Sequence, residues 1–188
     1  MFFCVLDAES ESDENDDALE IAFQAVASGD GEKIKDIYEL TKTAVFGYVF
    51  SILKNYEDSE DVVQDTYVKI YQNIGMYESQ GKPMAWIFVI ARNLALMKIR
   101  NQKRFVDIEE YEWDQLYKGN DYLGVEDKMV LKAAFSKLTS EECQFVMLHA
   151  LSGIKHREIA EMYGMPLATV LSKYNRAIKK LKKILEAE

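Results

Sequence analysis

Apolar residues recur at helical spacing along most of this chain, and few residues interrupt them. Leu19, Ala22, Phe23 and Val26, for example, fall at positions i, i+3, i+4 and i+7, which places them in one stripe along a helix. Only 2 prolines and 9 glycines occur among the 188 residues, and so few breakers argue against a β-sandwich or a loop-rich fold. The sequence therefore predicts an all-α protein.

Turn signals and composition divide the chain into four parts. The acidic residues 1–17 predict a disordered tail, and residues 18–105 predict a helical domain. Residues 106–124 are strongly acidic and predict a flexible linker. Residues 125–188 end in a short helix, a glycine-bearing turn and a long helix, the sequence form of a helix-turn-helix. We expect two small helical domains joined by this linker.

Three helix boundaries in the second domain are marked by particular residues. Thr139 is suited to cap a helix, Glu142 stands at the third helical position, and Leu138 precedes the cap, which is the pattern of a capping box with a hydrophobic staple. Gly164 closes the short helix, and Pro166 suits the start of the last one.

The charge of the chain is segregated. The net charge is −9, but residues 1–30 hold nine acids and no base. Residues 92–104 contain five bases and no acid, and residues 155–185 contain eight bases and two acids. Two basic segments separated by an acidic one suggest two contact surfaces for a polyanion such as DNA.

Five carboxylates gather in the stretch "NYEDSEDVVQDTY", residues 55–67. Glu57, Asp58 and Glu60 lie at or before the first turn of a predicted helix, where capping and the helix dipole account for them. The core face of that helix is predicted at Val63, Tyr67, Ile70 and Tyr71. A separate stripe at i, i+3, i+4 and i+7 consists of Asp61, Gln64, Asp65 and Val68. Two aspartates without a third ligand make a poor metal site, so this stripe is either a solvated face or a surface for a partner.

The last helix separates into an apolar face and a basic face. On the basic face Ser172, Asn175 and Arg176 are suited to read base edges in a major groove, while the lysines suit phosphates. The alternative without a binding role is a solvated basic face on an ordinary helical hairpin. A membrane-surface helix is disfavoured because no large aromatic anchor marks residues 178–185.

Other classes of function find little support in the sequence. There is no nucleophile beside a base, no paired acids with a reason for shifted pKa and no G-x-x-x-x-G-K loop, so we expect neither an enzyme nor a cofactor. His149 and His156 lack further ligands nearby, so no metal is expected. Cys4 and Cys143 match no zinc or redox spacing, and no apolar run approaches the roughly 18 residues of a membrane span. We expect a cytoplasmic protein without membrane insertion.

Three segments together resemble the extracytoplasmic-function sigma factors of bacterial RNA polymerase, in the sigma-70 family. They are "DSEDVVQDTYVKIY" (58–71), "AWIFVIARNLAL" (85–96) and "LTSEECQFVMLHALSGIKHREIAEMYGMPLATVLSKYNRAIKKL" (138–181). The resemblance implies that the first domain grips core RNA polymerase and the promoter's −10 element, while the second reads the −35 element. It implies three partners: the polymerase, through its large-subunit coiled coil and flap, promoter DNA, and an anti-sigma factor.

The resemblance also assigns residues to each contact. Core polymerase would bind Asp58, Asp61, Gln64, Asp65 and Val68. The −10 element would contact Tyr77, Lys82, Arg92, Asn93, Lys98, Arg100, Lys103 and Arg104. The −35 element would contact Thr169, Leu171, Ser172, Lys173, Asn175, Arg176, Lys179 and Lys180.

Four positions depart from the family's pattern. Ala168 stands where the family favours glycine, Leu171 where a basic or polar base reader is common, and Met97 where aspartate is frequent. Lys173 replaces arginine, which keeps the charge and loses bidentate geometry. Two alternatives remain: a sigma-like decoy or regulatory module that binds a partner but not DNA, and an ordinary helix-turn-helix regulator.

Overall fold

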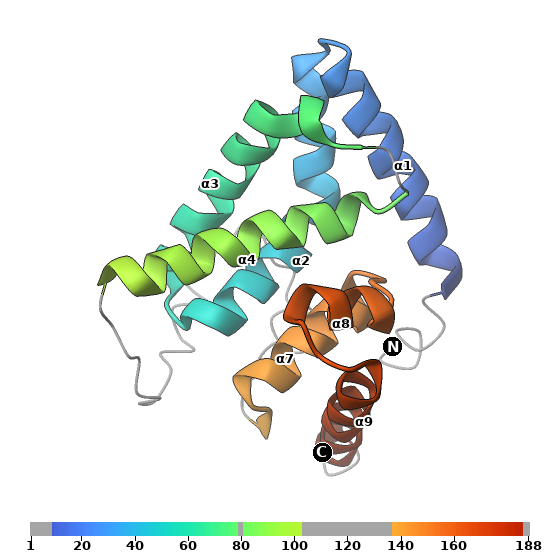
Figure 1. The fold of residues 1–188 in the computed structure, drawn as a ribbon, viewed down its shortest axis with the longest axis vertical. Coiled ribbons are helices and arrows are strands. Elements are labelled where there is room, and N and C mark those ends of the chain that lie inside the picture. The colour runs from blue at the N-terminus through green and yellow to red at the C-terminus, as the bar shows by residue number, and fades with distance from the viewer. Residues whose placement is uncertain (1–8, 79–80, 103–136, 186–188) are drawn as a thin grey trace.

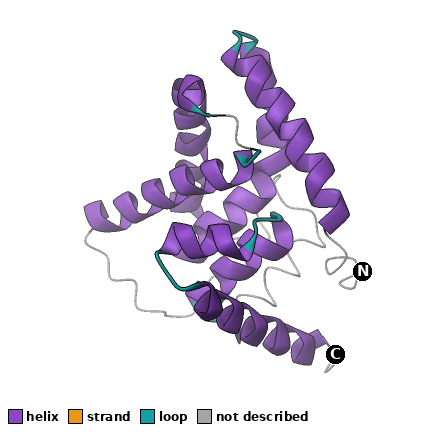
Figure 2. Ribbon diagram, turned by 45° about the vertical axis from the view of Figure 1, so that its right-hand side comes forward, coloured by secondary structure: helices purple, strands orange, loops and turns teal. Residues whose placement is uncertain are grey.

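The fold is seen in a computed structural model that describes residues 9–78, 81–102 and 137–185 (Figure 1). All regular structure within these residues is helical (Figure 2). The prediction of an all-α protein is confirmed. The predicted linker, residues 106–124, lies outside the described residues, as do Lys103 and Arg104.

Four helices form the N-terminal part of the molecule. They are α1 (Glu9–Ala27), α2 (Ile34–Leu53), α3 (Tyr56–Asn73) and α4 (Pro83–Gln102), with the short 3-10 helices η2 (Gly31–Lys33) and η3 (Ile74–Met76) between them. Helix α2 packs against the other three (Figure 1). Its Ile37, Val45 and Val49 are fully buried, because a central helix must bury apolar residues on more than one side.

Helix α1 begins earlier than its composition predicted. The acidic residues 9–17 are helical, whereas the sequence was expected to give a disordered tail up to residue 17. Leu19 and Phe23 are 1% exposed, so packing in the core holds the later part of α1 in its helical conformation. Extending a helix that is already nucleated is far easier than starting one, and carboxylates are favoured near a helix N-terminus.

The C-terminal part contains the predicted helix-turn-helix. Its elements are α7 (Ser140–Val146), the π-helical turn η4 (Met147–Leu151), α8 (His156–Tyr163) and α9 (Leu167–Leu185). The predicted capping box is present: Glu142 N donates to Thr139 Oγ1 at 3.3 Å, and Thr139 N donates to Glu142 Oε2 at 2.9 Å. Gly164 ends α8 with φ at 61°, in the left-handed region where glycine carries no Cβ penalty.

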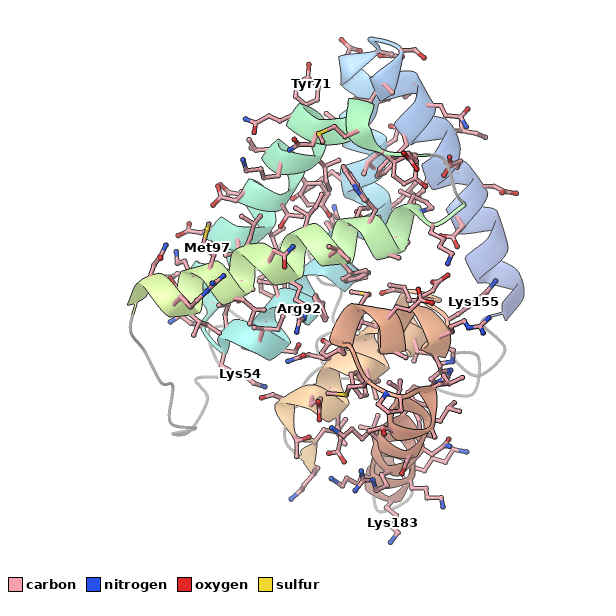
Figure 3. All side chains as sticks on the ribbon, in the orientation of Figure 1. Lys54, Tyr71, Arg92, Met97, Lys155 and Lys183 are labelled. Atoms are coloured by element: carbon pink, nitrogen blue, oxygen red, sulfur yellow. The ribbon has the colours of Figure 1, made fainter. Side chains whose placement is uncertain are left out.

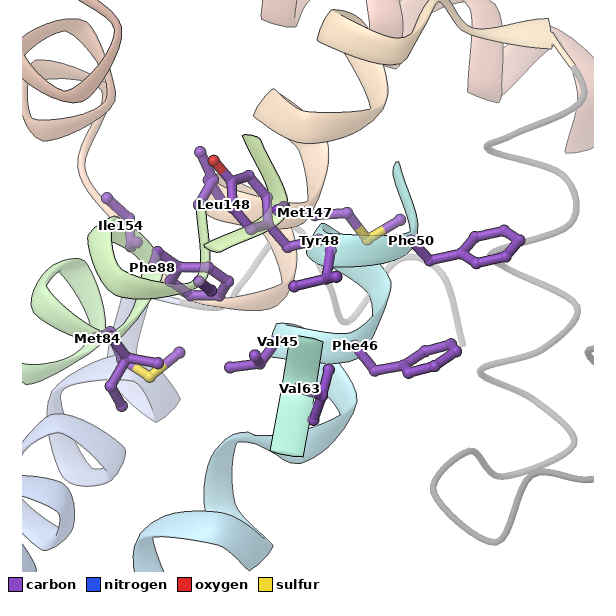
Figure 4. Close-up of a cluster of buried hydrophobic side chains, with 14 of the residues drawn as sticks. Val45, Phe46, Tyr48, Phe50, Val63, Met84, Phe88, Met147, Leu148 and Ile154 are labelled. Atoms are coloured by element: carbon purple, nitrogen blue, oxygen red, sulfur yellow. The ribbon is translucent and has the colours of Figure 1, made fainter. Parts of the chain in front are cut away.

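The N-terminal and C-terminal helices share an apolar interface. Helix α7 and turn η4 pack against α2, and the buried Met147, Leu148 and Ile154 join the same cluster as Tyr48 and Phe88 (Figure 4). The rings of Tyr48 and Phe88 meet edge to face with centroids 5.0 Å apart. In this arrangement the second half of the chain is packed onto the first.

Candidate polymerase and nucleic-acid interfaces

The first turn of α3 accounts for part of the acidic cluster. Asn55 is the N-cap residue, and its Oδ1 accepts a hydrogen bond from Asp58 N at 2.9 Å. Glu57 and Asp58 lie in the first turn, where the positive end of the helix dipole favours carboxylates. The predicted helix start is therefore confirmed.

Two other acids of the cluster, Asp61 and Asp65, belong to an exposed stripe on α3. Val63, Tyr67 and Ile70 are buried as predicted, but Tyr71 is 55% exposed and was wrongly assigned to the core face. Tyr71 lies over Gly31 instead. A Cβ atom added at Gly31 would be 3.1 Å from the Tyr71 hydroxyl. We call the following exposed residues the α3 stripe: Asp61, Gln64, Asp65 and Val68.

Lys98 of α4 lies against the N-terminal end of the α3 stripe. Its Nζ is 3.0 Å from Asp61 Oδ2 and 3.1 Å from Asp58 Oδ1. The hydrogen bond to Asp61 raises the pKa of Lys98. The resemblance assigned Lys98 to −10 DNA, but here it bridges two carboxylates that the resemblance assigned to the polymerase.

The outer side of α4 carries a mixed stripe. Asn93 and Arg100 are exposed, and Val89 and Met97 on the same side are 41% and 47% exposed. The sequence did not single out Val89, because it stands in an almost uniformly apolar run where periodicity cannot separate an outer face from an inner one.

Two predicted −10 residues contact helix α8, and one of them, Lys82, does so with its side chain 47% exposed. Lys82 Nζ is 3.0 Å from Glu158 Oε1 of α8. The Arg92 guanidinium lies over the ring of Tyr163, 4.7 Å from its centroid, and Figure 3 shows Arg92 on the side of α4 that faces α8. A cation over an aromatic face is an attractive contact, so α8 engages Arg92, whereas the ion pair of Lys82 remains open to solvent.

Tyr163 connects α8 to both halves of the chain. Its hydroxyl is 3.0 Å from the hydroxyl of Tyr48 and donates to Gln144 Oε1 at 2.6 Å. Burial raises the pKa of Tyr163 to about 12, which keeps the phenol neutral and able to donate. The hydroxyl pair therefore ties α2 to α8 beneath the Arg92 side chain.

Tyr77 is packed within an aromatic cluster. Its ring meets Phe23 edge to face at 4.8 Å and lies 5.5 Å from Trp86. Its hydroxyl donates to Glu20 Oε2 at 2.7 Å. The resemblance assigned Tyr77 to the base-capturing loop, and in this structure its side chain holds that loop against α1.

Helix α9 has the two faces that the sequence predicted. Val170 and Ala177 are fully buried and Leu181 is 2% exposed. Among the predicted −35 residues, Thr169 and Lys173 are half-buried, while those that are exposed are Leu171, Ser172, Asn175, Arg176, Lys179 and Lys180. Arg176 Nε also donates to the Ser172 carbonyl at 3.4 Å, which holds the guanidinium beside Ser172.

Two of these lysines also hold α9 against α7. Lys173 pairs with Glu141, and Lys180 Nζ is 2.7 Å from Glu142 Oε2. Burial alone would raise the pKa of Glu142, but hydrogen bonds from Lys180 and from the Thr139 backbone outweigh it and lower that pKa. Each of these lysines therefore has a carboxylate partner on α7, in addition to the DNA phosphate that it is predicted to contact.

The two histidines of the chain lie together in the helix-turn-helix. The rings of His149 and His156 have centroids 3.8 Å apart, and both meet Tyr174 edge to face. His149 Nδ1 lies 2.9 Å from the Ile154 carbonyl. His156 Nε2 is buried and finds no hydrogen-bond partner among the described residues. Within the same residues, no group of three potential ligands surrounds the pair.

This cluster predicts a loss of stability in mild acid. Burial, with a smaller contribution from His149, lowers the pKa of His156 from 6.5 to about 4. Folding therefore favours the neutral ring, and the unfolded chain binds more protons between these values. We expect the free energy of unfolding to be fully developed above about pH 6.5 and to fall towards pH 4, by on the order of 1–2 kcal/mol after screening.

Urea unfolding at several pH values measures this effect. Carboxylates also titrate below pH 5, so the informative quantity is the difference between the unmodified protein and His156→Gln. We expect the variant to have a shallower pH dependence between pH 6.5 and 4. Parallel curves for the two proteins would show that His156 does not contribute.

Models of one protein family match both parts of the chain. Sigma-70 region 2 matches residues 37–105, and Sigma-70, region 4 matches residues 128–181. The ECF RNA polymerase sigma factor SigK of Mycolicibacterium vanbaalenii is 22% identical over 175 residues, which cover 89% of each chain. The two matches together span more than half of the chain, and they follow the same order as the two predicted domains.

Solved structures support the fold. CnrH in complex with the cytosolic domain of CnrY matches with a TM-score of 0.61 and 23% identity, over 91% of this chain and 99% of that one. The sigma factor RpoE of Bartonella quintana, in complex with the anti-sigma factor NepR, matches with a TM-score of 0.60 and 22% identity, over 82% and 97%.

Among the described helices, none has both the length and the apolar character of a membrane span. The helical fold, the helix-turn-helix at residues 156–185 and the two family matches agree with the resemblance inferred from the sequence. The chain therefore belongs to the sigma-70 family of RNA polymerase sigma factors, in its extracytoplasmic-function group.

Proposed function

We propose that this chain binds core RNA polymerase, directs it to a promoter and helps to open the start region, with no chemistry of its own. One observation carries the proposal furthest: α9 of the helix-turn-helix exposes Ser172, Asn175 and Arg176 together on the side away from the core. Hydroxyl, amide and guanidinium groups are those that read base edges in a major groove.

The two parts of the chain have separate tasks in this proposal. Residues 18–105 bind the polymerase and the −10 element, and residues 125–188 read the −35 element and contact the polymerase flap. The α3 stripe supports the first task, because it combines exposed carboxylates with Val68, which is 54% exposed. An acidic stripe with an apolar end suits a basic, partly apolar surface such as the large-subunit coiled coil.

The proposed −10 contact involves two cations that also contact α8. Asn93 and Arg100 are exposed on α4, but Lys82 and Arg92 are held by Glu158 and Tyr163. In the DNA complex these two side chains exchange their partners on α8 for phosphates or unstacked bases. Lys98 remains paired with Asp58 and Asp61. In this proposal it orients the carboxylates of the α3 stripe and does not contact the DNA.

An anti-sigma factor is part of the proposal. The solved relative RpoE is described in complex with the anti-sigma factor NepR. By analogy with that relative, a partner of this kind would hold the present chain inactive in the cytoplasm. A partner that binds residues of the α3 stripe would compete directly with core polymerase.

Transcription with purified components tests the proposed function. The protein is added to sigma-free core polymerase with fragmented genomic DNA, and the transcripts are sequenced. We expect initiation at a defined set of promoters that share −35 and −10 elements. Core binding without promoter-specific initiation would overturn the proposal in favour of a sigma-like decoy that binds a partner but not DNA.

Arg176→Ala tests the −35 contact. Its guanidinium is exposed on α9, and the loss of one base-reading arginine is expected to lower promoter binding by about 10-fold to 100-fold and to relax the −35 preference. The measurement is holoenzyme binding to promoters with single changes in the −35 element. Lys183→Ala, at the far end of α9 (Figure 3), serves as the control and is expected to weaken all promoters equally. Loss of core binding by Arg176→Ala would contradict the assignment.

A further inference from the structure

The outer face of α9 begins with an apolar ridge. Leu167 and Leu171 are 42% and 38% exposed, and Ala168 between them is also exposed. Residues four apart lie above one another on a helix, so the two leucines form one continuous ridge. It occupies the N-terminal half of α9, the part of a recognition helix whose residues contact base edges.

The ridge is not part of the hydrophobic core. The same helix buries Val170, Ala177 and Leu181 at 0%, 0% and 2% exposure, and the two leucines lie off that face. Helix formation does not require leucine here, since lysine, arginine and alanine serve a helix equally well or better. Single exposed leucines are ordinary, but this pair borders Ser172, which shares the outer face with Arg176.

Only one apolar group is presented by base pairs in the major groove. It is the C5 methyl group of thymine, and small or branched apolar side chains contact it. A leucine side chain has no donor or acceptor for guanine or cytosine, so placing it there would desolvate their polar edges without a replacement hydrogen bond. An apolar ridge on a base-reading face therefore favours thymine over the other bases.

We propose that Leu171, with Leu167 beside it, reads a thymine methyl group in the −35 element of this protein's promoters. The inference rests on the proposed role of α9 as the −35 reader, and it adds the base that this part of the helix selects. A polar base reader at this position would select a hydrogen-bonding edge instead. The departure from the family's pattern at Leu171 is then a change of specificity, and the contact with DNA is retained.

Replacing thymine by deoxyuridine tests the proposal, because this change removes only the C5 methyl group. A promoter found in the transcription experiment is made with each −35 thymine on either strand replaced singly, and binding of the holoenzyme is measured. We expect one or two positions at which the replacement weakens binding about threefold to fivefold, as the loss of one buried methyl group implies. No sensitive position would overturn the proposal.

The Leu171→Ala variant assigns the effect to its residue. We expect it to bind the thymine promoter about threefold to fivefold more weakly and to be indifferent to deoxyuridine at the sensitive position. Lys182→Ala, exposed in the last turn of α9, is the control and is expected to keep the sensitivity. If the Leu171→Ala variant keeps its full sensitivity to deoxyuridine, the assignment of the methyl contact to Leu171 is overturned.

Three further outcomes separate this inference from the proposed function. Promoter-specific initiation without any methyl dependence would overturn the reading by Leu171 and leave the sigma-factor function intact. Absence of promoter-specific initiation would overturn both. Weaker binding of Leu171→Ala to core polymerase without DNA would also overturn the inference, because it would assign the ridge to a protein contact.

Discussion

Replacing both Asp61 and Asp65 by lysine is expected to lower the affinity for core RNA polymerase by more than about 100-fold. Both carboxylates are exposed on the α3 stripe, so the change reverses the charge of a surface without removing any core side chain. Like charges brought together across an interface cost several kcal/mol, and about 2.7 kcal/mol already corresponds to 100-fold. Affinity is measured with purified core polymerase by titration of the labelled protein.

A matched control separates the stripe from net charge. Asp17→Lys with Glu32→Lys changes the total charge equally at two exposed positions on α1 and η2 and is expected to leave core affinity within about threefold, because exposed charges outside an interface are screened. The double stripe variant should also retain its helical circular dichroism and the binding of DNA by α9. Unchanged core affinity of the Asp61→Lys, Asp65→Lys protein would contradict the assignment of the stripe to the polymerase.

The Tyr48→Ala substitution is expected to cost about 3–5 kcal/mol of stability. Tyr48 of α2 is fully buried, its ring packs against Phe88, and its hydroxyl lies 3.0 Å from that of Tyr163. Truncation leaves a cavity at the interface between the N-terminal and C-terminal helices and removes a hydrogen-bond partner from a buried phenol. Urea unfolding measures the change in the free energy of unfolding.

Two substitutions identify the source of that loss. Tyr48→Phe keeps the ring and loses only the hydroxyl, so we expect it to cost about 0.5–1.5 kcal/mol. Tyr71→Ala removes a tyrosine that is 55% exposed and is expected to change stability by less than about 1 kcal/mol. A cost below about 1 kcal/mol for Tyr48→Ala would show that the packing of the second half onto the first contributes little stability.

Local features were predictable where they depend on neighbours in the sequence. The capping box of Thr139 and Glu142, the left-handed Gly164 and the two faces of α9 were all expected and are present. Each arises from contacts within about one or two helical turns, which periodicity and capping rules describe. The error at Tyr71 has the opposite origin, because at the edge of an apolar face only the position of the neighbouring elements decides which side chains are covered.

The partners of the charged side chains were not predictable. Lys82, Arg92 and Lys98 read as a DNA-binding set, yet two of them meet α8 and the third bridges carboxylates on α3. Charge density shows that a segment can attract a polyanion. It does not show which acid or aromatic ring of the same chain comes within 3 to 5 Å after folding.

The helix-turn-helix, the acidic stripe and, through its motifs, the family could all be predicted from the sequence. These properties depend on residue order over short distances and on charge pattern, both of which are written directly in the chain. Three features depend on the three-dimensional packing: the second half packs onto α2 and α4, the Arg92 guanidinium lies over the Tyr163 ring, and two leucines remain exposed on α9. Such contacts join residues up to 115 positions apart, and they follow from three-dimensional packing, which local sequence patterns do not encode.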